Sequence, residues 1–600
     1  MKKLCFLPLF LLLFLPLFLL LFSCANTKPT TEVANDLFKT DIAFLKKEVA
    51  DLEHLVQNKA AANQIQQQFL KSREAYKKVE LLSEYYFPSV SKAINGPALD
   101  EYEIDEGITV APEGFQVIEE FVFPKYNPKD QTALLNQLGI LKANLNRLDL
   151  VSQTNTLTDS HIFDAIRLEV FRIVTMGITG FDSLIAQNSI PETLASLESI
   201  ESYCKIYNSE SNALQTALTT IEKGKKYLTQ HQDFNSFDRA YFIKEIANPL
   251  SKNIHQAQIK LQIPFLKDTR GLRTTAQTLF EKDAFDAEAF SGFPDYKTTP
   301  EKIKLGQELF NDPILSGDNS RSCASCHHSD KAFTDGQEKA ITIDGKSLVK
   351  RNTPTLSNIA FQRVFFSDSR VSYLEDQAVA VITNENEMHG SLEKSAEALK
   401  KNKEYVAKFK TAFPNKEIDA FAIKNVLASY IRSLSAYDAK FDGYMLDEVE
   451  FTKDEKAGFN LFAGKAKCAT CHFIPLTNGT VPPNYTKSES EVLGVPDKRN
   501  KLDADLGKFE LTKAELHKNS FKTPTIRNIA LTAPYMHNGV FKTLEEVIDF
   551  YNKGGGKGLG FSLENQTLPE DQLNLTESEK KQLIAFMKTL TDKKFKLLIF

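Results

Sequence analysis

Tryptophan is absent from the 600-residue chain, and cysteine, glycine and proline are sparse. Seven cysteines are too few for a disulfide scaffold, and 26 glycines with 23 prolines exclude a collagen-like or linker-like protein. Positive charge is not in excess, because 73 basic residues face 78 acidic ones. A nucleic-acid-binding protein is usually basic, so this balance argues against nucleic acid as a partner. The composition is instead that of a globular protein with several domains.

Long apolar runs are also lacking, with one exception at the N-terminus. Lys2 and Lys3 precede an apolar stretch at residues 4–22, which is followed by Ser23 and Cys24. A small residue and a cysteine after such a stretch resemble the lipoprotein box of a bacterial signal peptide. Residues 1–23 are therefore predicted to be a signal peptide and Cys24 a lipidation site, which anchors the chain in the periplasm or cell envelope. An uncleaved membrane anchor and plain secretion are the alternatives.

Four cysteines form two copies of the motif C-x-x-C-H, which attaches c-type haem. Two thiols one turn apart reach the two vinyl groups of one porphyrin, and the adjacent histidine ligates the iron. A zinc site or a redox dithiol also uses paired cysteines, but neither needs a histidine after each pair. We therefore predict two covalently bound haems. The residues concerned are Cys323, Cys326 and His327 for haem 1, and Cys468, Cys471 and His472 for haem 2.

The two haem motifs belong to a longer internal repeat. The pattern G-x-x-L-F precedes each motif, and T-P-T-x-x-N-I-A follows each, starting at Thr353 and again 170 positions further on at Thr523. Each copy is expected to be one cytochrome-c-like helical unit. At this offset Val381 in the first copy corresponds to Tyr551 in the second. Tyrosine can ligate iron and valine cannot, so one haem could be closed for electron transfer while the other stays open for chemistry.

Residues 290–595 resemble the bacterial dihaem cytochrome c peroxidases, and among them the MauG-like proteins. Besides the haem motifs, the resemblance rests on the segments RNTPT (351–355), FFSDSR (365–370), LEDQ (374–377), EM (387–388) and LTAPYMHNG (531–539). It implies that haem 1 is the peroxide site and that haem 2 handles electrons. It also implies that Gln377 and Glu387 line the distal face of haem 1, where Glu387 moves a proton between the peroxide oxygens. Glu385, two residues away, is the alternative carboxylate.

The resemblance further implies a calcium ion between the haems. Its ligands would be the side chain of Asn352 and the backbone carbonyls of Thr532 and Pro534, because a hard cation prefers oxygen. The alternative is an ordinary turn around Pro534.

The sequence departs from the family pattern in three ways. No histidine lies between His328 and His389, so no loop histidine can close haem 1 in its oxidised state. Tyr551 fits the sixth ligand of haem 2 in MauG rather than the methionine of the peroxidases, with Met536 as the alternative. Ser367 stands where the family usually has a tryptophan between the haems, so the inter-haem electron route is in doubt and the reaction of MauG itself is not implied.

The N-terminal half carries no haem motif. Its apolar residues recur at helical spacing, which predicts a helical bundle over residues 24–270. Residues 76–80 and 114–119 weakly resemble imelysin-like envelope domains, but Gln116 replaces the histidine of that motif. We therefore predict no peptidase or iron-binding activity there, and expect Glu119 to be a helix-surface or capping residue.

Residues 271–300 are predicted to be a linker, residues 301–450 the haem 1 domain and residues 451–600 the haem 2 domain, so that the fold is all-α. We expect a cytochrome c peroxidase in which a small cytochrome, or a similar donor, supplies electrons through haem 2 to reduce hydrogen peroxide at haem 1. A MauG-like oxidase of a protein substrate and a non-enzymatic dihaem electron carrier are the alternatives.

Overall fold

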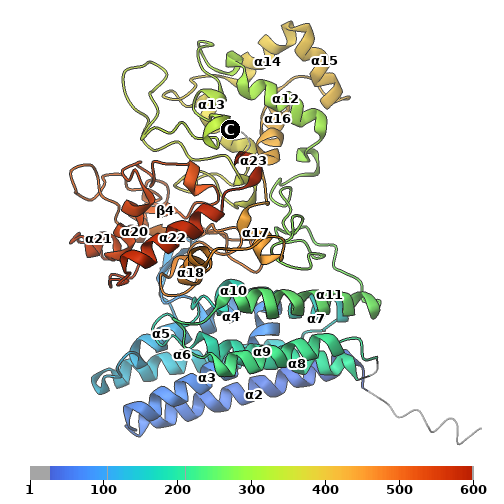
Figure 1. Ribbon diagram of the computed structural model, residues 1–600, viewed down its shortest axis with the longest axis vertical. Coiled ribbons are helices and arrows are strands. Elements are labelled where there is room, and N and C mark those ends of the chain that lie inside the picture. Colours follow the sequence, from blue (N-terminus) through green and yellow to red (C-terminus); the bar gives the residue numbers. More distant parts are fainter. Residues whose placement is uncertain (1–27, 104–105, 210, 597–600) are drawn as a thin grey trace, which may run out of the picture.

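The computed structural model describes residues 28–103, 106–209 and 211–596, and this part of the chain is mostly helical (Figure 1). Two short antiparallel pairs, β1 (Glu101–Glu103) with β2 (Ile108–Val110) and β3 (Ser490–Val492) with β4 (Ser520–Lys522), are its sheets. The expectation of a helical fold is thereby confirmed in its coarse form. The predicted signal peptide and Cys24 lie outside the described residues. Within the described ranges, no helix is long and apolar enough to cross a membrane.

The N-terminal part is a bundle of antiparallel helices, which forms the lower layer of Figure 1. The long helix α2 buries Phe38, Ile42 and Leu45, a spacing that places their side chains on one face against α3 and α6. Its helices are α2 (Thr30–Gln57), α3 (Ala62–Tyr86), α4 (Pro88–Asn95), α5 (Phe115–Val122), α6 (Gln131–Ser152), α7 (Asp159–Arg172), α8 (Ser189–Asn208), α9 (Gln215–Gln230), α10 (Arg239–Phe242) and α11 (Asn248–Lys260), with the π-helical turns η2 (Ile173–Gly177) and η3 (Ile243–Ala247).

The C-terminal part consists of two units that correspond to the two copies of the repeat. The first unit contains α12 (Pro300–Asn311), the haem-motif turn η6 (Cys323–Ser325), α13 (Leu374–Thr383), α14 (Leu392–Lys401), α15 (Lys403–Ala412) and α16 (Ala420–Ser433). The second unit contains α17 (Lys440–Met445), α18 (Lys453–Phe462), the haem-motif turn η9 (Cys468–Thr470), α19 (Phe509–Thr512), α20 (Leu544–Asn552), α21 (Gly555–Gly558), α22 (Glu577–Thr589) and α23 (Lys593–Lys596).

One helix crossing is the same in both units and explains a glycine of the repeat. A Cβ atom on Gly306 of α12 would lie 1.9 Å from the carbonyl oxygen of Val426 in α16. A Cβ atom on Gly458 of α18 would lie 1.9 Å from the carbonyl oxygen of Gln582 in α22. Only glycine permits helices to cross this closely, so the repeat of the sequence is also a repeat of the fold.

The two units exchange equivalent hydrogen bonds. The backbone N–H of Asn352 donates to the carbonyl of His537 at 2.8 Å, and the N–H of Lys522 donates to the carbonyl of Ser367 at 2.7 Å. Asn352 and Lys522 are 170 positions apart, and so are Ser367 and His537. The interface is therefore approximately two-fold symmetric, as in an isologous dimer.

The chain does not pass simply from one unit to the next. Helix α17 precedes residue 450, but its Phe441 packs against Phe459 and Phe586 of the second unit. Phe595 of α23, close to the C-terminus, packs against Phe333 of the first unit. The predicted boundary at residue 450 would place α17 in the first unit and α23 in the second. In the structure, each of these two helices packs against the opposite unit.

Residues 271–300, which we expected to be a linker, have no α-helix before α12 begins but are firmly packed. Leu272, Leu279 and Phe280 are almost completely buried in the hydrophobic core that the bundle shares with the second unit. The segment therefore connects the two halves of the chain and also helps to fix them together.

The bundle is docked on the second unit, with α10 next to α18 (Figure 1). Its π-helical turn η2 contacts the haem-motif turn η9. The side chain of Asn460 accepts a hydrogen bond from the N–H of Ala240 and donates one to Asp238, both at 3.1 Å. Phe181 lies edge-on to Phe473, the residue after the predicted haem ligand His472, with ring centroids 5.6 Å apart.

Candidate functional site

The first unit encloses a cavity of about 530 Å³ around its haem motif. Helix α13 brings Gln377 and Val381 to its wall, the loop after α13 brings Glu387, and α16 contributes Leu427 and Ile431. The predicted haem-attachment residues of this unit line the same cavity; these are Cys323, Cys326 and His327. The structure thus gathers residues that lie up to about a hundred positions apart in the sequence.

The surroundings of His327 fit the role of this side chain as an iron ligand. Its Nδ1 lies 2.8 Å from the carbonyl oxygen of Phe333, which holds the proton on Nδ1 and leaves Nε2 for a metal. Burial lowers the pKa of His327, so the imidazole is neutral. Burial also raises the pKa of the Cys323 thiol to about 12, so this thiol is neutral. Two thiols, a neutral imidazole and an enclosed, largely apolar space therefore fit a covalently attached haem.

Glu387 is held in the cavity wall by Asn384, a residue that the sequence did not single out. The Asn384 Nδ2 donates to Glu387 Oε1 at 2.9 Å. The orientation of this amide is fixed, because its Oδ1 accepts from the N–H of Asn386, also at 2.9 Å. The motif N-x-x-E, with an Asx turn between its ends, is the sequence feature that could have revealed this contact.

Two effects act on the Glu387 carboxyl group. Burial raises its pKa, and the guanidinium groups of Arg370 and Arg321 offset part of this rise. Arg321 also donates to the carbonyl oxygen of Glu387 at 3.3 Å and to that of Thr342 at 3.1 Å, so it joins the two loops that border the cavity. A carboxyl group with these opposing influences can both accept and release a proton.

The neighbouring ionisable residues lie outside the cavity. Glu385 and His389 are exposed to solvent, whereas Glu387 lines the cavity. Val381, which also lines the cavity, has no atom that could ligate iron. Within the cavity lining, His327 is therefore the histidine available to the iron.

In the second unit, the residues near the haem motif of Cys468, Cys471 and His472 include Tyr551. Tyr551 lies on α20, at the place that Val381 has on α13, and both cysteines and Glu491 lie near enough to influence its hydroxyl group. Burial lowers the pKa of His472 to about 4, so this imidazole is neutral as well.

Met536, the alternative ligand, is placed by the symmetry of the two units. Its equivalent in the first unit is Phe366, which lines the haem 1 cavity, so the repeat predicts that Met536 borders the haem 2 site. Met536 therefore stays the alternative to Tyr551 as a ligand of haem 2. Ser367, which stands at the tryptophan position of the family, lines the haem 1 cavity and contacts the second unit through its backbone.

The three residues expected at a calcium ion lie around one contact between the units. The Asn352 backbone bonds to His537, and Thr532 and Pro534 are in the same loop as His537. Asn352 Nδ2 donates to the carbonyl oxygens of Gln337 and Glu338, so its Oδ1 points elsewhere. Among the residues that the structure describes, the carbonyls of Thr532 and Pro534 accept no hydrogen bond. Free oxygen atoms of this kind suit a calcium ion.

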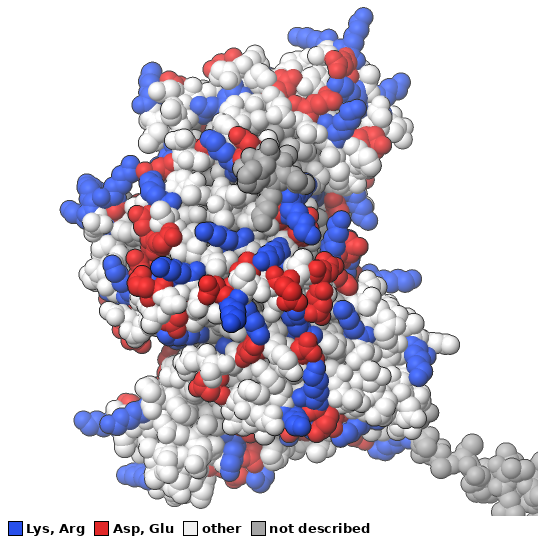
Figure 2. Space-filling model, in the orientation of Figure 1, with Lys and Arg blue, Asp and Glu red and all other residues white. Residues whose placement is uncertain are grey.

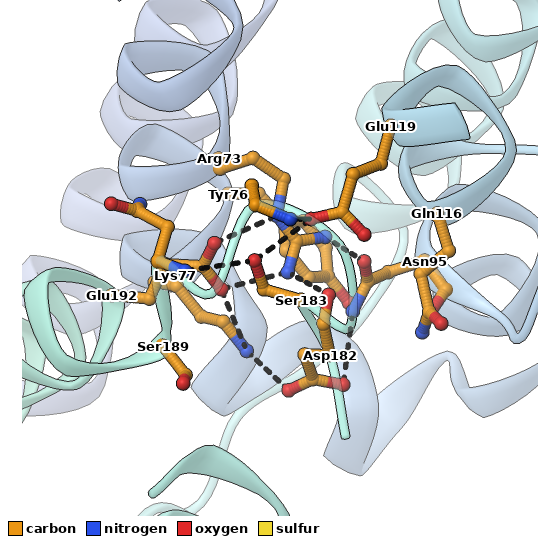
Figure 3. Close-up of polar contacts among 12 residues, drawn as sticks. Arg73, Tyr76, Lys77, Asn95, Gln116, Glu119, Asp182, Ser183, Ser189 and Glu192 are labelled. Atoms are coloured by element: carbon orange, nitrogen blue, oxygen red, sulfur yellow. Dashed lines mark hydrogen bonds and ion pairs between the residues drawn. The ribbon is translucent and has the colours of Figure 1, made fainter. Parts of the chain in front are cut away.

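The imelysin-like motif of the bundle lies in a buried network of charges (Figure 3). Arg73 pairs with Glu192 at 2.7 Å, and Lys77 pairs with Asp182 at 2.6 Å. Glu119 accepts hydrogen bonds from Ser183 Oγ at 2.8 Å and from the N–H of Ala186 at 3.1 Å.

Glu119 therefore caps the loop before α8, as expected, but it is buried and not on a helix surface. Gln116 donates to the carbonyl of Asn95 at 2.9 Å. Every partner named here is a residue of the bundle, so the network holds its helices together.

Comparisons with known proteins agree with this arrangement. A sequence model of the family described as di-haem cytochrome c peroxidase matches residues 300–450. The chain is 36% identical over 294 residues to the methylamine utilization protein MauG of Methylorubrum extorquens, covering 49% of this chain and 78% of that protein. It is 31% identical over 304 residues to the cytochrome c551 peroxidase of Nitrosomonas europaea, covering 50% of this chain and 83% of that protein.

The chain belongs to the dihaem cytochrome c peroxidase and MauG family. It is accordingly an oxidoreductase of the cytochrome c peroxidase type, and the family implies two c-type haems. A crystal structure of a MauG-like protein associated with microbial copper homeostasis is 30% identical, with a TM-score of 0.44, and covers 51% of this chain and 93% of that one. These relatives each match about half of the present dihaem protein.

Proposed function

We propose that this protein reduces hydrogen peroxide to water at haem 1, with electrons that a small cytochrome or similar donor delivers through haem 2. The overall change is H2O2 + 2 H⁺ + 2 e⁻ → 2 H2O. When bound, the haem irons supply the site where peroxide binds and the route by which electrons arrive. The chain itself has to position the peroxide, exclude competing ligands and move protons.

The placement of Glu387 is the observation that carries this proposal. Breaking the O–O bond by heterolysis requires a proton to move from one peroxide oxygen to the other, which leaves as water. Glu387 lines the same cavity as His327, and Asn384 fixes the orientation of its carboxyl group. Gln377 adds a nearby amide that can hydrogen-bond to the substrate. The exposed Glu385 could not serve, because it faces solvent.

The lack of a second histidine in the cavity lining supports an open peroxide site. Val381, at the position that Tyr551 has in the second unit, offers no ligand for iron, and His389 is exposed. Haem 1 would therefore accept peroxide without prior reduction. Tyr551 would close haem 2 with a fixed sixth ligand, which suits a centre that only passes electrons. Calcium held by Asn352, Thr532 and Pro534 would stabilise the contact between the units.

A second candidate is a MauG-like oxidase that draws electrons from a protein substrate. The position of Tyr551 beside the haem 2 cysteines favours it, because the resemblance to the MauG-like proteins implies a tyrosine ligand there. In either case we propose that Cys24 is lipidated and that the protein works at the periplasmic side of a membrane. We also propose that residues 301–450 and 451–600 form two cytochrome-c-like haem domains, with α17 and α23 each packed against the other domain.

Steady-state turnover of the holoprotein with peroxide and a reduced small cytochrome tests the proposal. Continuous oxidation of the cytochrome, two molecules per peroxide, supports the peroxidase. Rapid reaction with peroxide but no turnover of any small cytochrome favours the protein oxidase. If the oxidised protein does not react with peroxide, both enzymatic functions are excluded and a non-enzymatic electron carrier remains.

A further inference from the structure

Lys522, the last residue of β4, is a half-buried cation without an acid partner among the described residues. Its ammonium group donates to the side-chain oxygen of Gln362. No carboxylate of the described residues lies within ion-pair distance of it. Burial lowers its pKa to about 8, which leaves most of the lysine charged at pH 7. A buried charge with only one neutral partner is costly unless something else compensates it.

Two arginines of the haem units show the contrast. Arg351 pairs with both Asp368 and Asp505 at 2.7 Å. Arg527 pairs with Asp442 at 2.6 Å and with Asp592 at 3.2 Å. Each arginine thus has two carboxylate partners, whereas Lys522 has none among the described residues, which leaves its ammonium group free to bind an anion that is not part of the polypeptide.

The location of Lys522 shows where that anion would come from. Its backbone bonds to Ser367, which lines the haem 1 cavity, and its equivalent in the first unit, Asn352, lines that cavity as well. The two-fold relation of the units therefore places Lys522 at their interface, beside haem 2 as Asn352 lies beside haem 1. A c-type haem brings two propionate carboxylates into such a site.

The internal repeat also shows how the two units differ at this place. The equivalent of Lys522 in the first unit is Asn352, and the two residues make matching backbone hydrogen bonds across the interface. Asn352 is neutral and is the residue for which we propose a calcium ion. Lys522 provides a positive charge of its own at the same place in the second unit. Both sides of the interface would then carry a cation next to a haem.

We propose that Lys522 is the counterion of a haem 2 propionate. The ammonium group would donate a charge-assisted hydrogen bond to the carboxylate, and the Gln362 amide, whose oxygen already binds Lys522, would donate a second one from its nitrogen. The proposal goes beyond the peroxidase function, since it holds equally for an oxidase or an electron carrier.

A cation at this place has a definite consequence for the potential of haem 2. Reduction removes one positive charge from the iron, so a nearby ammonium group favours the reduced state. Without it, the bare propionate would favour ferric iron. Replacement of Lys522 by an uncharged residue is therefore expected to lower the midpoint potential of haem 2, while haem 1, on the other side of the interface, changes less.

Spectroelectrochemical titration of the holoprotein tests this inference without peroxide. Lys522→Met should lower the potential of haem 2, and Lys522→Arg should preserve it. Lys588→Met is the matched control, because Lys588 is an exposed lysine of the same unit, on α22, and should leave both potentials unchanged. An unchanged haem 2 potential in Lys522→Met, or a larger shift in haem 1 than in haem 2, would overturn the assignment.

A second measurement covers the case in which Lys522→Met does not load haem. Resonance Raman spectra of Lys522→Arg, which keeps the charge, should show a shifted propionate bending band for haem 2, because the hydrogen-bond geometry changes. Identical propionate bands in wild type and Lys522→Arg would show that this side chain does not contact a propionate.

Discussion

Glu387→Gln should slow the reaction of the oxidised protein with peroxide while leaving the cavity intact. Glutamine has the same shape as glutamate, and its carbonyl oxygen can still accept the hydrogen bond from Asn384 Nδ2 that now reaches Oε1 at 2.9 Å. It cannot accept and release a proton. The substitution therefore removes one chemical function and little else.

The size of the effect follows from the role of the carboxyl group. General acid–base catalysis by a positioned side chain contributes roughly 10²–10⁴-fold. At about 1.36 kcal/mol for each factor of ten, this range corresponds to roughly 3–5 kcal/mol in the activation free energy. Stopped-flow mixing of the ferric holoprotein with peroxide, followed at the Soret band, measures the rate constant directly and does not depend on the electron donor.

The dependence of this rate constant on pH provides a further test. A proton acceptor has to be deprotonated, so the rate constant of the wild type should fall as the pH drops through the pKa of Glu387. Burial places this pKa above the ordinary value for glutamate, so the fall begins at a higher pH than it would for an exposed carboxyl group. Glu387→Gln should lose this pH dependence.

Glu385→Gln is the matched control, because it makes the same change of charge two residues away on an exposed side chain. It should react with peroxide at nearly the wild-type rate. Equal losses in the two variants, or an acid limb that persists in Glu387→Gln, would refute the assignment of Glu387 as the proton carrier.

Three further outcomes are expected. Asn384→Asp replaces a hydrogen-bond donor to Glu387 with a negative charge, so the pKa of Glu387 should rise and the acid limb of the peroxide reaction should move to higher pH; an unmoved limb would mean that Asn384 does not position this carboxyl group. Electron paramagnetic resonance of the oxidised holoprotein should show one high-spin and one low-spin ferric haem, and two low-spin signals would contradict an open haem 1. Tyr551→Phe should remove the low-spin signal and raise the potential of haem 2, whereas unchanged spectra would point to Met536.

The sequence predicted the features that depend on short spacing or on the repeat. Each C-x-x-C-H motif is complete within five residues, so its chemistry could be recognised without a fold. The offset of 170 between the copies placed Val381 and Tyr551 at equivalent positions, and the structure puts them at equivalent places on α13 and α20. The helical character of the bundle was likewise predictable from the period of its apolar residues.

Features that depend on distant contacts were not predicted. Residues 271–300 have the glycines and prolines of a linker, yet the apolar side chains of Leu279 and Phe280 are buried because the bundle and the second unit close over them. Glu119 was expected to be a surface or capping residue, and its burial follows from the loop before α8, more than sixty positions away. Asn384 was missed because its significance lies in the direction of its amide, which the turn to Asn386 determines.

Charge is spread over the surface in mixed patches of both signs on the face shown in Figure 2, so this face displays no single strongly charged docking area. The face of the second unit beside its haem-motif turn is covered by the bundle, where Phe181 contacts Phe473 and Asp238 contacts Asn460. A donor that delivers electrons to haem 2 therefore has to approach the second unit from another side.

The two haem units share one scaffold and differ at a few equivalent positions, and these differences provide the functional asymmetry. Gly306 and Gly458 allow the same helix crossing, so both units hold their haem motif in the same frame. Valine on α13 would leave one haem open, whereas a tyrosine at the matching place on α20 would close the other. Asparagine in one unit and lysine in the other then set different charges beside the two haems. Because the frame is constant, each of these single substitutions can change one haem without disturbing the fold, which is why the matched variants proposed above can separate their effects.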